Sequence, residues 1–251
     1  KGRWNGKQLI SEEYITEATS KQIDNSIQGS QGYGYQIWRE KYNGFSFRGM
    51  GSQFALCFPD KELLFACISD TQGSETERPS ITDVFFDEIY SKIVDSQLPC
   101  DEQAYARLKE KIENLKILPQ RGNLTSPFVE KVNSKWYRLN DNPMKIRRMR
   151  LIFDGDEGTW EYENATGHHK LKFGIGKTVQ DSFPEKHYFG EKIGTPWGRG
   201  YDCLSSAAWV EEHKLNMLVY ITDIYLGSLK ITFSFKGNEI AVYMTKAAEW
   251  F

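Results

Sequence analysis

The chain has 251 residues, of which 39% are hydrophobic, 14% aromatic and 26% charged, and its mean hydropathy is −0.57. This composition is typical of a globular protein and excludes a disordered, collagen-like or membrane-bundle chain. The 32 basic and 34 acidic side chains give a net charge of −2, without the basic stripe of a nucleic-acid binder. We therefore expect no nucleic-acid partner and, because long apolar runs are lacking, no membrane span.

The first hundred residues predict a short helix followed by an antiparallel sheet. Residues 11–20 begin with Ser11 in the N-cap position and carry apolar side chains at helical spacing. Three β-rich runs follow, and the turn signals Asn43-Gly44 and Pro59-Asp60 arrange them as a meander. These runs span residues 35–40, 45–48 and 53–70.

A second helix is predicted near residue 80, where Ser80 and Asp83 have the spacing of a capping box. The apolar residues that follow share one helical face, so this helix should cover one face of the sheet. An open sheet needs further elements on its other face. We therefore expect a part of the protein N-terminal to this chain to be missing.

The remaining residues predict a connector and a β-barrel. Residues 98–133 contain three prolines and one modest helix at 101–115, which is typical of a connector. Residues 134–251 alternate with period two between turns about ten residues apart, which predicts an up-and-down, lipocalin-like barrel of about eight strands. Such a barrel either packs its interior with side chains or holds one small ligand.

The predicted fold class is thus α+β. A truncated antiparallel sheet with flanking helices spans residues 1–97, and an all-β barrel follows the connector at residues 134–251.

Several ordered segments of the first hundred residues resemble the β-lactamase-related serine hydrolases. The runs at 1–11 and 17–20 are similar to a stretch of that family. Residues 32–38 resemble the strand before its active-site edge, and residues 48–63 resemble the edge strand with its following hairpin. This family contains class C β-lactamases, low-molecular-weight penicillin-binding proteins and related esterases and amidases. The resemblance implies an acyl-enzyme formed on the serine of a Ser-x-x-Lys motif, assisted by a Tyr-x-Asn tyrosine.

The sequence departs from the family at the nucleophile. None of its 18 serines has lysine three positions later. In the family order the nucleophile precedes the region around Trp4, so we expect the chain to begin after the catalytic serine and to be inactive by itself. Tyr162-Glu163-Asn164 matches Tyr-x-Asn, but it lies downstream in the barrel half and is interpreted as a chance match.

Within this chain, only the edge strand corresponds to a functional part of the family's active site. The resemblance implies that the backbone of Gly49, Met50 and Gly51 lines the oxyanion, with the Met50 N–H as the donor. A glycine-rich β-bulge is the alternative interpretation. Arg48 and Ser52 are the candidate substrate-binding residues, and Arg48 could bind a substrate carboxylate bidentately unless it is simply solvated.

We therefore predict the C-terminal part of a serine hydrolase that, when complete, cleaves an amide, ester or lactam in a small or peptide-like substrate. The alternative is a non-catalytic binding module whose barrel holds a small apolar ligand or docks a partner. No cofactor and no metal site are expected. An exposed sheet edge and apolar face predict a homodimer or pairing with the missing N-terminal part, and the compartment, cytoplasmic or extracytoplasmic, stays open.

Overall fold

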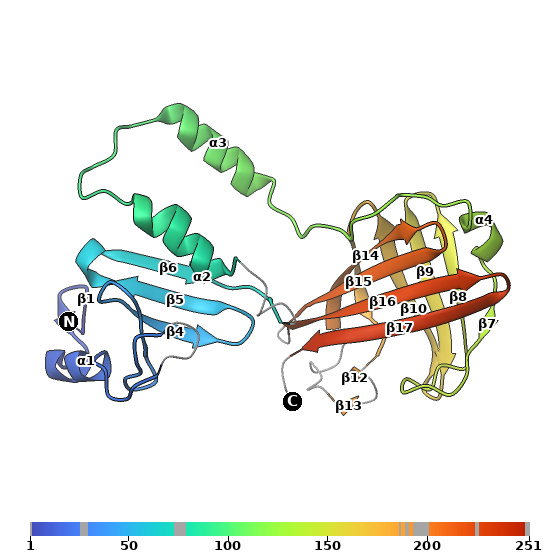
Figure 1. The fold of residues 1–251 in the computed structure, drawn as a ribbon, viewed down its shortest axis with the longest axis horizontal. Helices are drawn as coiled ribbons and strands as arrows, with labels where there is room; N and C mark the ends of the chain where they lie inside the picture. The colour runs from blue at the N-terminus through green and yellow to red at the C-terminus, as the bar shows by residue number, and fades with distance from the viewer. Residues whose placement is uncertain are drawn as a thin grey trace. The chain divides into compact units, whose positions relative to one another are not determined.

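The computed structural model divides into two compact units, Lys1–Pro99 and Cys100–Phe251 (Figure 1). The division falls two residues beyond the predicted boundary at residue 97, and most of the predicted connector belongs to the second unit. The structure describes residues 2–25, 30–72, 79–185, 187–188, 191–192, 201–223 and 226–248.

A four-stranded antiparallel sheet is the centre of the first unit (Figure 1). Its strand order, β3-β4-β5-β6, follows the chain and confirms the predicted meander. The helix expected after Ser11 is also confirmed, because the Ser11 hydroxyl accepts a hydrogen bond from the Tyr14 amide at 3.2 Å. The elements are β1 (Arg3–Trp4), β2 (Lys7–Gln8), α1 (Glu12–Ala18), β3 (Trp38–Arg39), β4 (Phe45–Gly49), β5 (Gln53–Phe58) and β6 (Leu63–Cys67).

One helical segment covers one face of this sheet. It begins at the predicted capping box, in which the Ser80 hydroxyl accepts from the Asp83 amide while the Asp83 carboxylate accepts from the Ser80 amide. Phe85 is 1% exposed and stacks on Phe58 and Phe65 of the sheet, with ring centroids 5.6 and 4.6 Å apart. The segment comprises α2 (Ile81–Val84), a π-helical turn (Phe85–Ile89) and a 3₁₀ turn (Tyr90–Lys92).

The opposite face of the sheet carries apolar side chains that remain exposed. Strand pairing places Phe47 opposite Ala55 and Cys57 opposite Leu64, all on the face away from Phe85. Phe47 is 50% and Leu64 is 64% exposed. An antiparallel sheet with one solvated face normally carries polar residues there, so these exposed apolar side chains are unusual for a solvated face.

The second unit is a nearly closed barrel built on one sheet (Figure 1). Eight of its strands follow one another in the order β17-β16-β15-β14-β10-β9-β8-β7, and β11 pairs with β14 off this path. A separate pair is formed by β12 (His187–Tyr188) and β13 (Glu191–Lys192). The barrel strands are β7 (Tyr137–Arg138), β8 (Arg148–Asp154), β9 (Glu157–Asn164), β10 (Gly167–Ile175), β11 (Val179–Phe183), β14 (Tyr201–Glu211), β15 (Lys214–Thr222), β16 (Leu226–Lys236) and β17 (Glu239–Ala248).

The barrel departs from the predicted up-and-down topology at one joint. β10 and β14 pair in parallel through only two residue pairs, Gly174 with Ser206 and Ile175 with Ala207. The reason is β11, which lies between β10 and β14 in the chain and reverses its direction. Because β14 pairs antiparallel with β11, β14 runs in the same direction as β10. A lipocalin-like barrel is antiparallel throughout, so this joint corrects that part of the prediction.

Side chains fill the barrel interior. The alternating residues predicted to face inward on β15 and β16 are buried, as the period of a half-buried strand requires. Large aromatic residues occupy the centre, and Trp160, Tyr162, Phe173, Trp209 and Phe233 are each at most 1% exposed. Segments before the barrel contribute as well, because α4 (Val129–Val132) buries Val132 in this core.

The predicted α+β class with flanking helices is wrong. Strands make up 44% and helices 17% of the residues that the structure describes, and a barrel-like sheet dominates. The helix expected at residues 101–115 forms α3 (Glu102–Glu113), but its apolar residues Tyr105, Leu108 and Ile112 are all more than half exposed. Helical periodicity reports an amphipathic helix without specifying a surface for it to pack on. No helix in the described ranges is long and apolar enough to span a bilayer.

A ladder of charged residues crosses the outside of β8, β9 and β10. Glu161 on β9 lies between Arg150 and Lys170, which bind its carboxylate at 2.7 Å each. Its side chain is only 2% exposed. Burial by itself raises the pKa of Glu161, but the hydrogen bonds from Lys170 and Arg150 outweigh burial and hold the pKa below its ordinary value.

We expect Glu161→Gln to destabilise the barrel by about 1–3 kcal/mol at neutral pH, because two cations lose their shared carboxylate. Since the folded-state pKa is lowered, the contribution of Glu161 exists above the unfolded-state pKa and disappears as pH falls through the folded-state pKa. The matched control is Glu163→Gln, which breaks the more exposed pair with Arg148 and should cost clearly less, because solvent screens that pair. Urea denaturation at neutral and acidic pH measures both, and equal costs for the two variants would contradict the expectation.

Candidate functional site

The predicted site residues lie at the end of β4 and in the turn that follows it. β4 and β5 are last paired at Gly49 and Gln53, so Met50, Gly51 and Ser52 form the hairpin loop. Gly51 and Ser52 have φ angles of +71° and +66°. The left-handed conformation explains the glycine at position 51, because a side chain there is strained.

This loop is fixed by bonds to the chain that follows β6. The Ser69 hydroxyl donates to the Gly51 carbonyl at 2.9 Å, and the Thr71 amide donates to the same carbonyl at 3.2 Å. The hydroxyls of Ser52 and Thr71 are 2.7 Å apart. Ser52, predicted to bind substrate, is therefore engaged in holding the loop.

The end of β4 has an open edge within the described residues. β3 pairs only with Phe45 and Ser46, and no described strand pairs with the same edge of β4 beyond that point. The Glu40 amide donates to the Gly44 carbonyl at 2.9 Å, so the backbone of Gly44 faces β3. Alternate residues of a strand face the same neighbour, which directs the backbone of Arg48 to the open edge. Met50, two residues further on, is 53% exposed.

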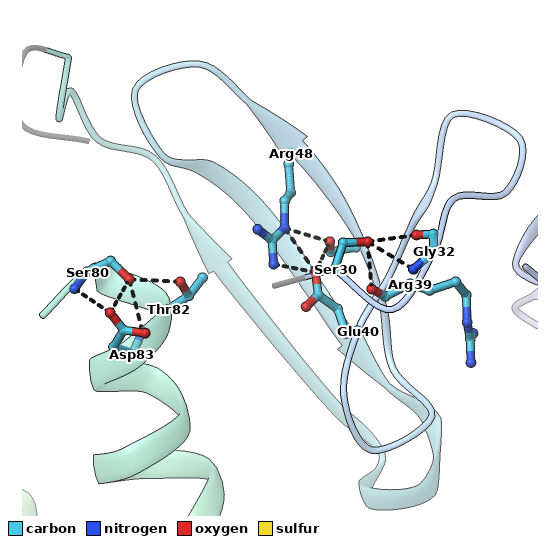
Figure 2. Close-up of polar contacts among 9 residues, drawn as sticks. Ser30, Gly32, Arg39, Glu40, Arg48, Ser80, Thr82 and Asp83 are labelled. Carbon is cyan, nitrogen blue, oxygen red and sulfur yellow. Dashed lines mark hydrogen bonds and ion pairs between the residues drawn. The ribbon is translucent and has the colours of Figure 1, made fainter. Parts of the chain in front are cut away.

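Arg48 itself forms a buried ion pair with Glu40 (Figure 2). Its Nε and Nη2 donate to Glu40 Oε1 at 2.9 and 2.6 Å, and the Ser46 hydroxyl donates to the same oxygen at 2.5 Å. The two charged side chains are 9% and 2% exposed. Arg48 also lies over the ring of Phe54, 5.6 Å from its centroid. The guanidinium is thus committed to Glu40, and a substrate carboxylate would have to displace that residue.

A loop beside β3 holds Glu40 in place. The Ser30 hydroxyl donates to the carbonyls of Gly32 and Arg39 at 2.8 and 3.3 Å and accepts from the Gly32 amide at 3.1 Å (Figure 2). The Arg39 guanidinium in turn binds the Thr19 carbonyl at 2.9 Å. These bonds hold the backbone just before Glu40 in place. They thereby position the Glu40 carboxylate for its contact with Arg48 on β4.

Sequence analysis missed Glu40. The sequence does contain a signal, because the acidic Glu40 and the basic Arg48 lie on either side of the Asn43-Gly44 turn. Opposite charges on neighbouring strands often pair. The structure brings Glu40 and Arg48 together because both project onto the face covered by Phe85, where an unpaired charge is costly.

A second polar cluster lies in the barrel unit, around the Tyr-x-Asn match. The Tyr162 hydroxyl and the Asn164 amide both donate to Glu185 Oε1, at 2.9 and 2.6 Å. The His169 ring stacks on Tyr162 with centroids 5.0 Å apart, and its Nε2 is 3.6 Å from Glu185 Oε1. Burial raises the pKa of Tyr162 far above its ordinary value, and the Glu185 charge raises it further. Tyr162 is therefore a neutral hydrogen-bond donor and a poor general base.

Comparison with known proteins adds no relative. No protein-family model matches the chain, and a search of curated proteins finds no match. Within the described ranges, no three or more His, Cys, Asp or Glu side chains are grouped so that they could hold a metal ion.

Proposed function

We propose that the first unit supplies the oxyanion side of the active site of a β-lactamase-related serine hydrolase, which cleaves an amide, ester or lactam through an acyl-enzyme. The open edge at the end of β4 carries this proposal, because no described strand pairs with that edge beyond Ser46 and the neighbouring Met50 is 53% exposed. Attack on a carbonyl develops negative charge on its oxygen, and a positioned N–H stabilises that charge.

Each predicted residue has a specific part in this proposal. The Met50 N–H is the oxyanion donor, Gly49 is the last residue of β4 before the loop, and Gly51 permits the turn. Arg48 acts as a positioning residue through Glu40, and Ser52 acts through Thr71. The serine nucleophile and its lysine lie outside these 251 residues, since no Ser-x-x-Lys occurs within them.

The exposed apolar face of the first sheet fits the same proposal. Phe47 and Leu64 lie there as large, solvent-exposed side chains. We propose that the part of the hydrolase carrying the nucleophile packs on this face. Such packing would remove the apolar side chains from water.

The proposal is tested in the hydrolase that carries the Ser-x-x-Lys segment together with this chain. Met50→Pro removes the N–H and should lower kcat by about 10²–10³-fold, the cost of losing one oxyanion donor. Met50→Leu keeps the N–H and is the matched control, with activity close to that of the parent. Thermal unfolding of both variants distinguishes lost catalysis from lost folding.

The chain alone provides a second test. Incubated with a chromogenic cephalosporin or a p-nitrophenyl ester, it should show no turnover above buffer, because nucleophile and base are both absent. Turnover that a serine-directed acylating reagent abolishes would overturn the proposal. The alternative of a ligand-holding barrel is less well supported, because aromatic side chains occupy the barrel centre.

A further inference from the structure

We propose that the barrel unit binds a compact oxyanion, a phosphate or carboxylate group, in a basic pocket at the connection between β7 and β8. The pocket has a volume of about 390 Å³ and is lined mainly by residues 138–147. This proposal concerns the second unit alone and does not depend on the hydrolase function.

The charge of the pocket favours an anion. Arg138, Lys145 and Arg147 line it, and Asp141 is the one carboxylate among the lining residues. The Lys145 ammonium binds the Asp141 carboxylate at 2.9 Å, so these two charges neutralise each other. The two arginines then give the pocket a positive charge that nothing in its lining compensates.

Neither arginine has an acceptor for its guanidinium among the described residues. In the part of the chain that the structure describes, no hydrogen bond or ion pair engages the guanidinium of Arg138 or Arg147. The nearby carboxylate of Glu163 attracts Arg147, but its two oxygens already bind Arg148 at 2.8 and 2.5 Å. A planar guanidinium presents donors in a fork that matches a phosphate or carboxylate, so an oxyanion is the ligand these groups fit best.

The backbone of the pocket is already ordered. The Asn142 side chain donates to the carbonyls of Asn140 and Ile146 at 2.9 and 2.8 Å and accepts from the Ile146 amide at 3.1 Å. The Leu139 amide donates to the Arg147 carbonyl at 3.0 Å, and Ile146 is anchored at 2% exposure. A ligand would therefore order only side chains, which keeps the entropic cost of binding small.

Isothermal titration of this chain with inorganic phosphate, pyrophosphate and citrate tests the proposal. At least one anion should bind saturably, and Arg138→Gln or Arg147→Gln should weaken that binding about tenfold, as the loss of a charge-assisted hydrogen bond does. Arg107→Gln, an exposed arginine on α3, makes the same change in net charge and should leave binding unchanged. Asp141→Asn should tighten binding, because it removes the carboxylate from the lining and frees Lys145.

Three outcomes would overturn the proposal. One is that none of the three anions binds at millimolar concentration. Another is that Arg107→Gln weakens binding as much as the pocket variants, which would mean non-specific attraction to charge. The third is that the chain sediments with phosphatidic acid vesicles but binds no free anion, which would make the pocket a membrane contact. Because all variants change exposed side chains, circular dichroism should show that each keeps the parent fold.

Discussion

Replacing Arg48 with methionine should lower the free energy of unfolding of the first unit by about 3–5 kcal/mol, the cost of leaving one member of a buried ion pair without its partner. Glu40 is 2% exposed, and Arg48 provides its two nitrogen donors at 2.9 and 2.6 Å. After the substitution, the Ser46 hydroxyl is the one hydrogen-bond donor left to that carboxylate among the described residues, which is too little to offset its loss of water.

The control for this prediction is the double variant Glu40→Leu with Arg48→Met. Replacing both charges with apolar side chains of similar size removes the buried charge altogether, and the cost should be small or even negative. Chemical denaturation of the two single variants and the double variant gives the coupling free energy directly. If Arg48→Met alone costs less than about 1 kcal/mol, the pair behaves as a solvated one, and Arg48 is available to a substrate.

Replacing Trp160 with alanine should destabilise the barrel by about 3–5 kcal/mol, the range for truncating a large aromatic residue in a core. Trp160 is 1% exposed and packs against Tyr162 and Phe233, with ring centroids 4.4 and 5.9 Å away. The surrounding strands are paired along their length, so they cannot collapse far into the space left behind. Urea denaturation followed by far-ultraviolet circular dichroism measures the change.

Trp160→Phe is the matched control. The Trp160 Nε1 is buried and, among the described residues, has no hydrogen-bond partner. A phenyl ring keeps most of the apolar contact and removes this unsatisfied donor, so the change in stability should stay within about 1.5 kcal/mol. If Trp160→Phe lowers the free energy of unfolding about as much as Trp160→Ala does, the expectation is contradicted. The indole N–H would then have to make a stabilising hydrogen bond.

The elements predicted correctly from sequence are those set by neighbouring residues. Ser11 caps α1, the Ser80 and Asp83 pair caps α2, and turn residues separate the strands of the first sheet. Each signal acts within one helical turn or one hairpin, so no knowledge of distant contacts was needed. The period-two alternation of β15 and β16 likewise identified which side chains face the barrel interior.

The incorrect predictions concern contacts between elements. An α+β class with flanking helices was expected, whereas a barrel-like sheet dominates the described residues. The barrel was expected to be antiparallel throughout, but β11 pairs with β14 and makes the β10 joint parallel. Neither outcome is encoded by periodicity, because the same pattern suits several partners and several strand orders.

The site residues show the same division. The family resemblance placed Gly49, Met50 and Gly51 on an edge strand, whereas the fold ends β4 at Gly49 and places Met50 and Gly51 in the hairpin loop. It offered Arg48 as a substrate ligand, whereas the fold pairs Arg48 with Glu40, eight residues earlier in the chain. Arg138 and Arg147 carry no sequence signal as a pair, since their shared pocket exists only once the β7–β8 loop has folded.

For this protein, the sequence alone determined the helix caps, the strand segments, the turns and the inward faces of the barrel strands, because these depend on propensities and spacings within about ten residues. The tertiary structure decided which charges are paired, which edge of β4 stays open and how the barrel closes. Those outcomes depend on burial and on pairing between residues far apart in the chain. A charge without a partner is costly where it is buried and is solvated at little cost where it is exposed.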